Sequence, residues 1–247
     1  MFDRIYYVIM VPMVYVALGV FLFGIVARSI RIILAPRQMT TLQVFPATRH
    51  AWFHALVDTF LMPTVKTLRP ALWVFTLLFH AALVLLVIGH LELIREFRAL
   101  QIIPHEVFLG GGLVGLVLTV SVSYFLFSRF KTPYREISVP EDYFLLLLLL
   151  FTVLSGAHMN WAKYLSPAGF DIAVSSYREY LSSILLFRPA VPAGIAGSPH
   201  YVLVALHVFL ANCFLMFLPF SKIMHTFFAL PLNLIRRGGL RGASPSP

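Results

Sequence analysis

Charged side chains are scarce in this sequence. Asp, Glu, Lys and Arg make up 12% of the residues and hydrophobic types 60%, whereas soluble domains carry about 25% charged residues. This fraction is too small to cover a surface in water, so the composition excludes an ordinary soluble protein. Apolar runs of about 20 residues recur along the chain, and this length predicts membrane-spanning helices rather than the shorter alternating strands of a β-barrel.

Acidic residues and cysteine are also rare. The chain has 10 Asp and Glu against 19 Lys and Arg, a formal net charge of +9, and a single cysteine, Cys213. One cysteine in an apolar run can form neither an internal disulfide nor an iron–sulfur site, so any cluster must belong to a partner. The basic excess is typical of membrane loops on one face, and we expect no nucleic-acid binding. The sequence has no nucleophile triad, phosphate-cradling glycine loop or zinc motif.

The apolar runs predict an all-α integral membrane protein with a bundle of five transmembrane helices. The first run is too long and too mixed in composition for a cleaved signal peptide, and we expect it to be a span. We expect one membrane domain over residues 1–235, followed by a polar cytoplasmic tail at 236–247. The expected spans are 6–27, 71–94, 107–127, 143–160 and 200–228.

Basic residues set the expected orientation. With the N-terminus outside, thirteen Lys and Arg residues fall in the inner segments and six in the outer ones, which favours a cytoplasmic C-terminus. Two loops have helical periodicity of their own. RHAWFHALVDTFLM, at 49–62, is expected to lie along the inner interface, and its His50 and His54 to belong to a partner-docking surface. FDIAVSSYREYLSSILLF, at 170–187, is expected to form a helix in the outer loop.

Four histidines lie inside two of the apolar runs. LLFHAALVLLVIGH carries His80 and His90, and LHVFLANCFLMFLPFSKIMH carries His207 and His225. Histidine inside a membrane span is rare and usually functional. His80 lies about 16 Å of helix rise from the inner basic residue Arg69, and His225 lies about 16 Å from Arg236, whereas His90 and His207 lie toward the outer ends. Paired by depth, the four predict two bis-histidine haems, an inner one and an outer one.

The spacing within the two runs differs. Ten residues separate the first two histidines, about 15 Å of rise, and eighteen separate the other two, about 27 Å. Two straight parallel helices cannot match both pairs at equal depth. Pro219 lies between His207 and His225, and we expect it to kink or locally unwind that helix. Eighteen residues are five whole turns, so these two histidines share one helix face.

These motifs resemble the gamma subunit of respiratory nitrate reductase and its relatives, which include cytochrome b subunits of heterodisulfide-reductase-like and sulfite-reductase-associated membrane complexes. The resemblance rests on FHAALVLLVIGH and LPFSKIMH and covers most of the chain. It implies an inner haem b between His80 and His225 and an outer haem b between His90 and His207, the pairing that depth also indicates. It further implies a prokaryotic plasma membrane, a menaquinone-type quinol as exchangeable substrate, and a cytoplasmic iron–sulfur partner. One departure is IIPHEVFLGGG, which has no lysine where nitrate reductase uses one at its quinone site; this favours another of these complexes or a differently built site.

Further residues are candidates for the quinone-binding site. His158 lies at the outer end of the fourth run, at the depth of the outer haem. It either contacts the quinone or a haem propionate, or replaces a haem ligand, or is an interfacial histidine beside Trp161. His105 and Glu106 could take protons from a quinol, or they could be ordinary polar residues of a loop. Gly89 could allow close approach of a ring, or serve helix packing.

Basic residues near the span ends are candidates for haem propionate contacts. Arg69 and Lys222 lie toward the inner face, and Arg95 and Arg98 toward the outer face. The alternative is that these side chains extend to the interface as ordinary snorkelling charges.

The sequence therefore predicts a di-haem cytochrome b subunit of a membrane quinol:acceptor oxidoreductase. It would transfer electrons within a larger complex and have no stand-alone catalysis. A second hypothesis keeps the haems but places the exchange partner outside, as a periplasmic cytochrome c docked on the long outer loop. A third is a haem-free proton-coupled transporter or channel that uses intramembrane histidines as a relay, although Asp and Glu lie only near span ends or in loops. A passive anchor would leave the paired histidines unexplained.

Overall fold

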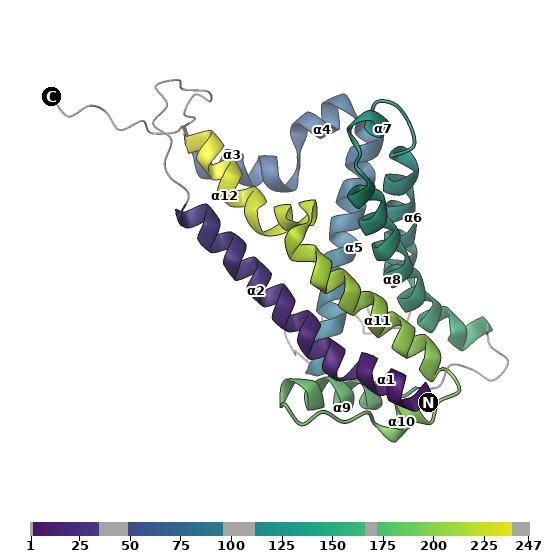
Figure 1. Cartoon of the computed structure of the whole chain (residues 1–247). Coiled ribbons are helices and arrows are strands. Elements are labelled where there is room, and N and C mark those ends of the chain that lie inside the picture. The colour runs from purple at the N-terminus through teal and green to yellow at the C-terminus, as the bar shows by residue number, and fades with distance from the viewer. Residues whose placement is uncertain (1, 35–48, 96–111, 166–171, 239–247) are drawn as a thin grey trace. The chain divides into compact units, whose positions relative to one another are not determined.

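The computed structural model describes residues 2–34, 49–95, 112–165 and 172–238 (Figure 1). All regular structure in these ranges is helical. The α-helices are α1 Phe2–Met10, α2 Pro12–Leu34, α3 Ala51–Phe60, α4 Pro63–Leu68, α5 Pro70–Ile94, α6 Leu113–Ser128, α7 Tyr134–Ile137, α8 Pro140–Leu165, α9 Val174–Leu185, α10 Ala193–Ala196, α11 Tyr201–Phe217 and α12 His225–Gly238. Two 3₁₀ turns, η3 Leu218–Phe220 and η4 Lys222–Met224, join α11 to α12.

Within the described ranges, four helical stretches are long and apolar enough to cross a membrane: Asp3–Leu34, Pro70–Ile94, Pro140–Ala162 and Tyr201–Phe220. The predicted all-helical membrane class is confirmed. The remaining predicted span, 107–127, meets α6, an apolar helix of 16 residues, and residues 107–111 lie outside the described ranges. Five spans and the orientation of the termini therefore stay predictions.

The chain divides into two compact units. The first unit comprises Met1–Phe21 and Leu78–Phe217, and the second comprises Leu22–Leu77 and Leu218–Pro247. The first therefore holds α6 to α11 with most of α5, and the second holds α3, α4 and α12 with most of α2.

One core of the first unit joins α1, α8, α9 and α11. Its fully buried members include Met10 and Ile195. The Tyr180 hydroxyl on α9 donates to the Met10 carbonyl at 2.5 Å, and the Tyr15 hydroxyl on α2 donates to the Ile184 carbonyl at 2.9 Å. Burial raises the pKa of Tyr180, so this phenol stays a neutral donor. The helix expected within 170–187 is thus confirmed as α9 and is fixed to the N-terminal helices.

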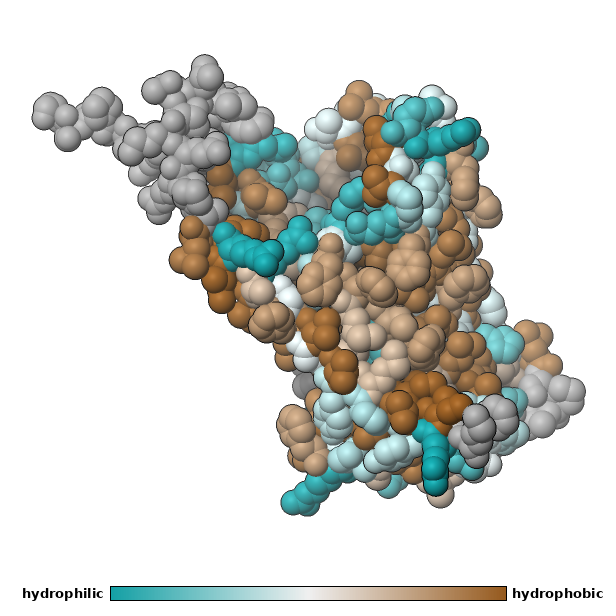
Figure 2. Space-filling view, viewed as in Figure 1, coloured by the Kyte–Doolittle hydropathy of each residue, from teal (hydrophilic) through white to brown (hydrophobic). Residues whose placement is uncertain are grey.

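A second core of the first unit packs α5, α6 and α8 through Ala82, Leu118 and Val153. A Cβ atom on Gly115 would lie 2.9 Å from the Ala157 Cβ, so α6 and α8 approach closely because one of them carries no side chain there. Large apolar side chains on the outer faces of these helices stay exposed, as the brown surface in Figure 2 shows. Such a surface suits contact with lipid.

The first predicted span is broken where the sequence analysis expected a continuous helix. The 6–27 run maps to α1 and α2, which meet at Val11, directly before Pro12. Proline has no backbone N–H and cannot continue the hydrogen-bond ladder. Asn212, buried on α11, donates from Nδ2 to the Ile9 carbonyl at 3.2 Å and so satisfies a group at this break.

In the second unit α3 and α12 are joined by an ion-pair cluster. The Asp58 carboxylate accepts two hydrogen bonds from Arg237, at 2.6 and 2.8 Å, and one from Arg236 at 2.6 Å. Asn233 Nδ2 donates to the Thr59 hydroxyl at 2.9 Å. The expected amphipathic segment 49–62 is therefore helical over Ala51–Phe60, and α12 continues through Arg236 and Arg237 to Gly238.

We expect Asp58→Asn to loosen α12. The hydrogen bond from Arg237 lowers the pKa of Asp58, with Arg236 adding to it against the effect of burial. A lowered carboxyl pKa contributes stability above the unfolded-state value of about 3.9, and this is lost as pH falls through the folded value. Because both arginines are partly exposed, the expected cost is only about 1–2 kcal/mol.

Hydrogen exchange of the α12 amides, corrected for intrinsic rates, measures this effect. Protection in the wild type should fall below about pH 4, whereas in Asp58→Asn it should be lower at neutral pH and insensitive to that window. Glu141→Gln, an exposed carboxyl at the start of α8, is the matched control. Equal protection of α12 in wild type and Asp58→Asn would contradict a stabilising role.

Candidate functional site

His90 on α5 and His207 on α11 lie face to face within the first unit. Their ring centroids are 6.4 Å apart and their planes differ by 27°. The structure therefore brings together the two histidines that the sequence pairs by depth.

Each ring of this pair is held through Nδ1. His90 Nδ1 lies 2.9 Å from the Leu86 carbonyl on its own helix, and His207 Nδ1 lies 3.1 Å from the Thr152 carbonyl on α8. A carbonyl only accepts, so in the neutral rings Nδ1 carries the proton in both cases. Nε2 then keeps its lone pair, which is the state that metal ligation requires.

Helix α8 supports His207 with three residues that the sequence analysis missed. The Ser155 hydroxyl donates to the Thr152 carbonyl at 2.9 Å, and its oxygen lies 3.1 Å from His207 Nδ1, where it accepts. A Cβ atom on Gly156 would lie 3.0 Å from His207 Cε1. The ring thus packs against bare backbone. The sequence does contain a signal for these supporting residues, namely that polar and small residues recur at helical spacing within a leucine-rich span.

The other two histidines, His80 and His225, lie in different units. His80 is half-buried on α5 in the first unit. His225 is the first residue of α12 in the second unit, and its Nδ1 lies 3.1 Å from the Lys222 carbonyl. Both stay predicted ligands, and their pairing stays a prediction.

The segment before His225 departs from the single 200–228 helix that the sequence predicted. The α-helix ends at Phe217, and two 3₁₀ turns separated by Ser221 replace it because Pro219 interrupts the ladder. The expected local unwinding at Pro219 is confirmed. The Ser221 hydroxyl accepts from the Ile223 amide at 3.1 Å and caps the second turn.

Helix α2 contacts the segment of 3₁₀ turns that follows α11, within the second unit. The Arg28 guanidinium donates from Nη1 to the Pro219 carbonyl at 3.1 Å and to the Ser221 carbonyl at 3.4 Å. One turn earlier, a Cβ atom on Gly24 would lie 2.5 Å from the Pro219 Cβ, so only glycine fits there. Gly24 and Arg28 are further residues that the sequence analysis missed, because neither forms a motif.

The remaining candidates are scattered. Gly89 is buried, whereas Arg69, Arg95 and Lys222 are exposed at helix ends. Glu92, which the sequence analysis did not single out, is 2% exposed two residues after His90. The predicted Arg98, His105 and Glu106 lie outside the described residues.

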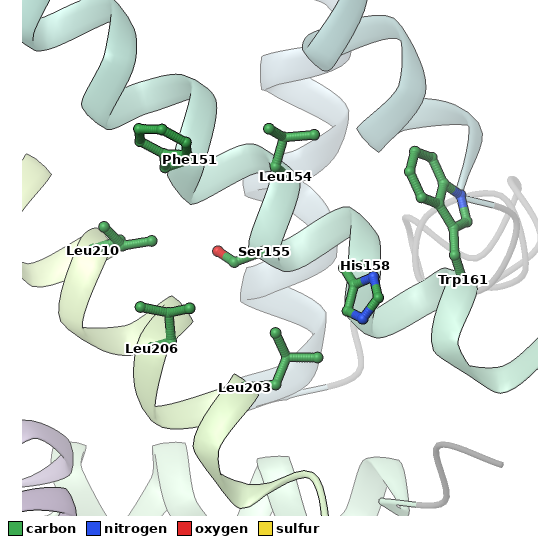
Figure 3. Close-up of a pocket in the computed structure, with 8 residues that line it drawn as sticks. All are labelled: Phe151, Leu154, Ser155, His158, Trp161, Leu203, Leu206 and Leu210. Atoms are coloured by element: carbon green, nitrogen blue, oxygen red, sulfur yellow. The ribbon is translucent and has the colours of Figure 1, made fainter. Parts of the chain in front are cut away.

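His158 lines a groove between α8 and α11 (Figure 3). The groove has a volume of about 440 Å³. Its walls are apolar apart from His158, Ser155 and the indole N–H of Trp161. The lining residues are Phe151, Leu154, Ser155, His158, Trp161, Leu203, Leu206 and Leu210.

Residues 67–240 match the family model described as nitrate reductase gamma subunit. The chain belongs to this family. The matched region runs from the end of α4 through α12 and includes His80, His90, His207 and His225, so the resemblance predicted from two motifs is confirmed. Gamma-subunit family members are electron-transfer subunits of oxidoreductase complexes.

Three relatives resemble this gamma-subunit family member. It is 29% identical over 167 residues to the Hdr-like menaquinol oxidoreductase cytochrome b-like subunit of Archaeoglobus fulgidus, covering 62% of the chain and 47% of the relative. The same subunit of Archaeoglobus profundus is 28% identical over 170 residues, with 62% and 46% covered. The nitrate reductase gamma chain of Bacillus subtilis is 30% identical over 169 residues, with 65% and 73% covered. The match spans about half the length of the Archaeoglobus relatives.

Proposed function

We propose that this gamma-subunit family member is a di-haem cytochrome b. It would exchange electrons between a quinol or quinone near the outer face and a cytoplasmic iron–sulfur subunit. The observation that carries the proposal is the His90–His207 pair, with ring centroids 6.4 Å apart and both Nδ1 atoms hydrogen-bonded.

The chain's own residues would orient and tune the outer haem ligands. When bound, a haem b carries one electron at a potential set by its axial ligands and surroundings. The Leu86 and Thr152 carbonyls hold the two Nδ1 protons in place, which fixes the ring orientation and raises the basicity of Nε2. Arg95 and Arg98 would pair with the propionates on the outer side.

The inner haem would lie between His80 and His225. Support comes from the depth of the two residues in the sequence and from their presence within the matched family region. Arg28 fixes the turn that leads into His225, and Arg69 and Lys222 would pair with the propionates of this haem.

The proposed partners in electron exchange are inferred from the names of the relatives and from the single cysteine of this chain. Two of the relatives are named menaquinol oxidoreductase subunits, which supports a menaquinone-type quinol here. Gly89, His105, Glu106 and His158 are the proposed residues of the quinone side. With Cys213 as the single cysteine, iron–sulfur clusters must lie on another subunit in the cytoplasm of a prokaryotic cell.

Haem content tests the proposal. A pyridine haemochrome assay on the folded protein, made with haem available, should give about two haems b per chain, one for each bis-histidine pair, with a matching dithionite-reduced minus oxidised spectrum. One haem would show that one pair is wrong. None would overturn electron transfer and favour the proton-coupled transporter.

A further inference from the structure

We infer that Ser155 is a positioning residue that lowers the reduction potential of the haem held by His90 and His207. It would act through His207, because its hydroxyl oxygen lies 3.1 Å from His207 Nδ1. This inference rests on the proposed function and deepens it, since it names the side chain that sets the potential of one of the two haems.

The Ser155 hydroxyl, the Thr152 carbonyl and the His207 ring form a closed set of three hydrogen-bonding groups. The hydroxyl donates to the carbonyl at 2.9 Å. His207 Nδ1 lies 3.1 Å from that carbonyl and 3.1 Å from the serine oxygen. A hydroxyl has one proton, and Ser155 directs it at the carbonyl. Its oxygen is therefore an acceptor for the Nδ1–H group, which faces two acceptors at once.

His90 has a simpler environment. Within the described residues its Nδ1 has one hydrogen-bond partner, the Leu86 carbonyl at 2.9 Å. The two imidazoles of the pair therefore differ by one hydroxyl oxygen. Because a hydroxyl that donates to a carbonyl is polarised by it and becomes a better acceptor, the additional oxygen acts on His207 alone.

Helix α8 keeps the serine oxygen at this nitrogen. Ser155 is 8% exposed, and its bond to the carbonyl three residues earlier holds the side chain, which Figure 3 shows on α8, in one orientation. The next residue, Gly156, leaves room for the ring, since a Cβ atom there would lie 3.0 Å from His207 Cε1. A serine followed by a glycine thus allows the imidazole to reach both acceptors.

The direction of the effect follows from charge. An acceptor at Nδ1–H draws the proton away from the ring, which makes Nε2 a stronger electron donor to a bound metal. A stronger donor stabilises ferric iron more than ferrous iron, because the ferric form carries one more positive charge, and this lowers the reduction potential. Removal of the Ser155 oxygen should therefore raise it.

Three substitutions of Ser155 test this in a component-resolved redox titration of the purified full chain. Ser155→Ala should raise the potential of this haem by at least about 30 mV, a threefold change at 59 mV per tenfold for one electron. Ser155→Cys should raise it as well, because sulfur is a weaker acceptor. Ser155→Thr should restore the wild-type value, because threonine makes the same bond to a carbonyl one turn earlier and its methyl group can extend into the open groove that Ser155 lines.

Two standards accompany these variants. The haem proposed for His80 and His225 is the internal one, and its potential should not move. Ser121→Ala is the matched variant, because Ser121 is 1% exposed on α6 and its hydroxyl makes no hydrogen bond within the described residues. It should leave the potential of the haem held by His90 and His207 at the wild-type value.

EPR spectroscopy of the ferric protein separates this effect from a displaced ring. The spectrum of a bis-histidine haem depends on the angle between its two imidazole planes, which is 27° for His90 and His207. In Ser155→Ala the ring of His207 keeps the Thr152 carbonyl, so the g values should be unchanged while the potential rises.

The contrary outcomes are distinct from failure of the proposed function. With both haems bound, an unchanged or lowered potential in Ser155→Ala would overturn the inference, and so would a shift that came with altered g values. Loss of this haem from the alanine and cysteine variants would also overturn it, because the hydroxyl would then serve haem binding. Absence of haem from the wild type would instead reject the proposed function itself.

Discussion

His90→Leu and His207→Leu should each yield a protein that binds about one haem b per chain instead of two. In the proposed di-haem scheme, removal of either imidazole would leave the haem held by His90 and His207 with one protein ligand, which leucine cannot replace. The two rings lie with centroids 6.4 Å apart, so both substitutions should remove the same haem. Redox titration followed by optical and EPR spectroscopy should show the same remaining component in both variants.

The complementary substitutions define the other haem. His80→Leu and His225→Leu should each remove the inner component and retain the outer one. His54→Leu, on the exposed side of α3, is the control and should keep both. Loss of both haems in every ligand variant, or of neither, would contradict the pairing. A variant pair that removed different components would show that its two histidines do not share an iron.

Gly24→Val should displace the turn before His225 and reduce inner haem occupancy by at least about half. A Cβ atom at position 24 would lie 2.5 Å from the Pro219 Cβ, and valine adds two methyl groups with restricted rotamers. Overpacking of this kind typically costs about 1–3 kcal/mol and shifts backbone. The shifted backbone is the segment whose Pro219 and Ser221 carbonyls Arg28 holds.

The same helix provides a matched control for this prediction. A Cβ atom on Gly19 would meet nothing within 4 Å, so Gly19→Val should leave both haems in place. Component-resolved redox titration of the two variants, with the outer haem as an internal standard, measures the effect. Arg28→Gln, which removes two hydrogen bonds without crowding, should shift the inner haem potential and retain the haem. Equal inner haem content in both glycine variants would refute the steric argument.

Local sequence signals were sufficient for much of the fold. Long apolar runs predicted the membrane helices because few other structures satisfy the backbone in lipid. Pro219 predicted the break after α11 because proline interrupts a helix wherever it lies in the interior. Pro12 carries the same signal, and the helix is interrupted at Val11 within the predicted 6–27 span.

The supporting residues could not be predicted in the same way. Ser155 and Gly156 act on His207 across more than fifty residues of sequence, and Arg28 acts on Pro219 across 191. Nothing in the local pattern distinguishes these residues from ordinary small or basic residues of membrane helices. The histidines themselves were identifiable because an imidazole in lipid is rare, whereas a serine or glycine there is common.

His90 and His207 are anchored unequally. His90 is hydrogen-bonded to Leu86 on its own helix, whereas His207 is hydrogen-bonded to Thr152 on a different helix. A tilt of α5 therefore carries one imidazole and its anchor together as a rigid body. A tilt of α8 relative to α11 instead twists the other imidazole about its side-chain bonds. Helix tilt responds to bilayer thickness, so a change in thickness would move His90 together with α5 but would twist His207 about its side-chain bonds.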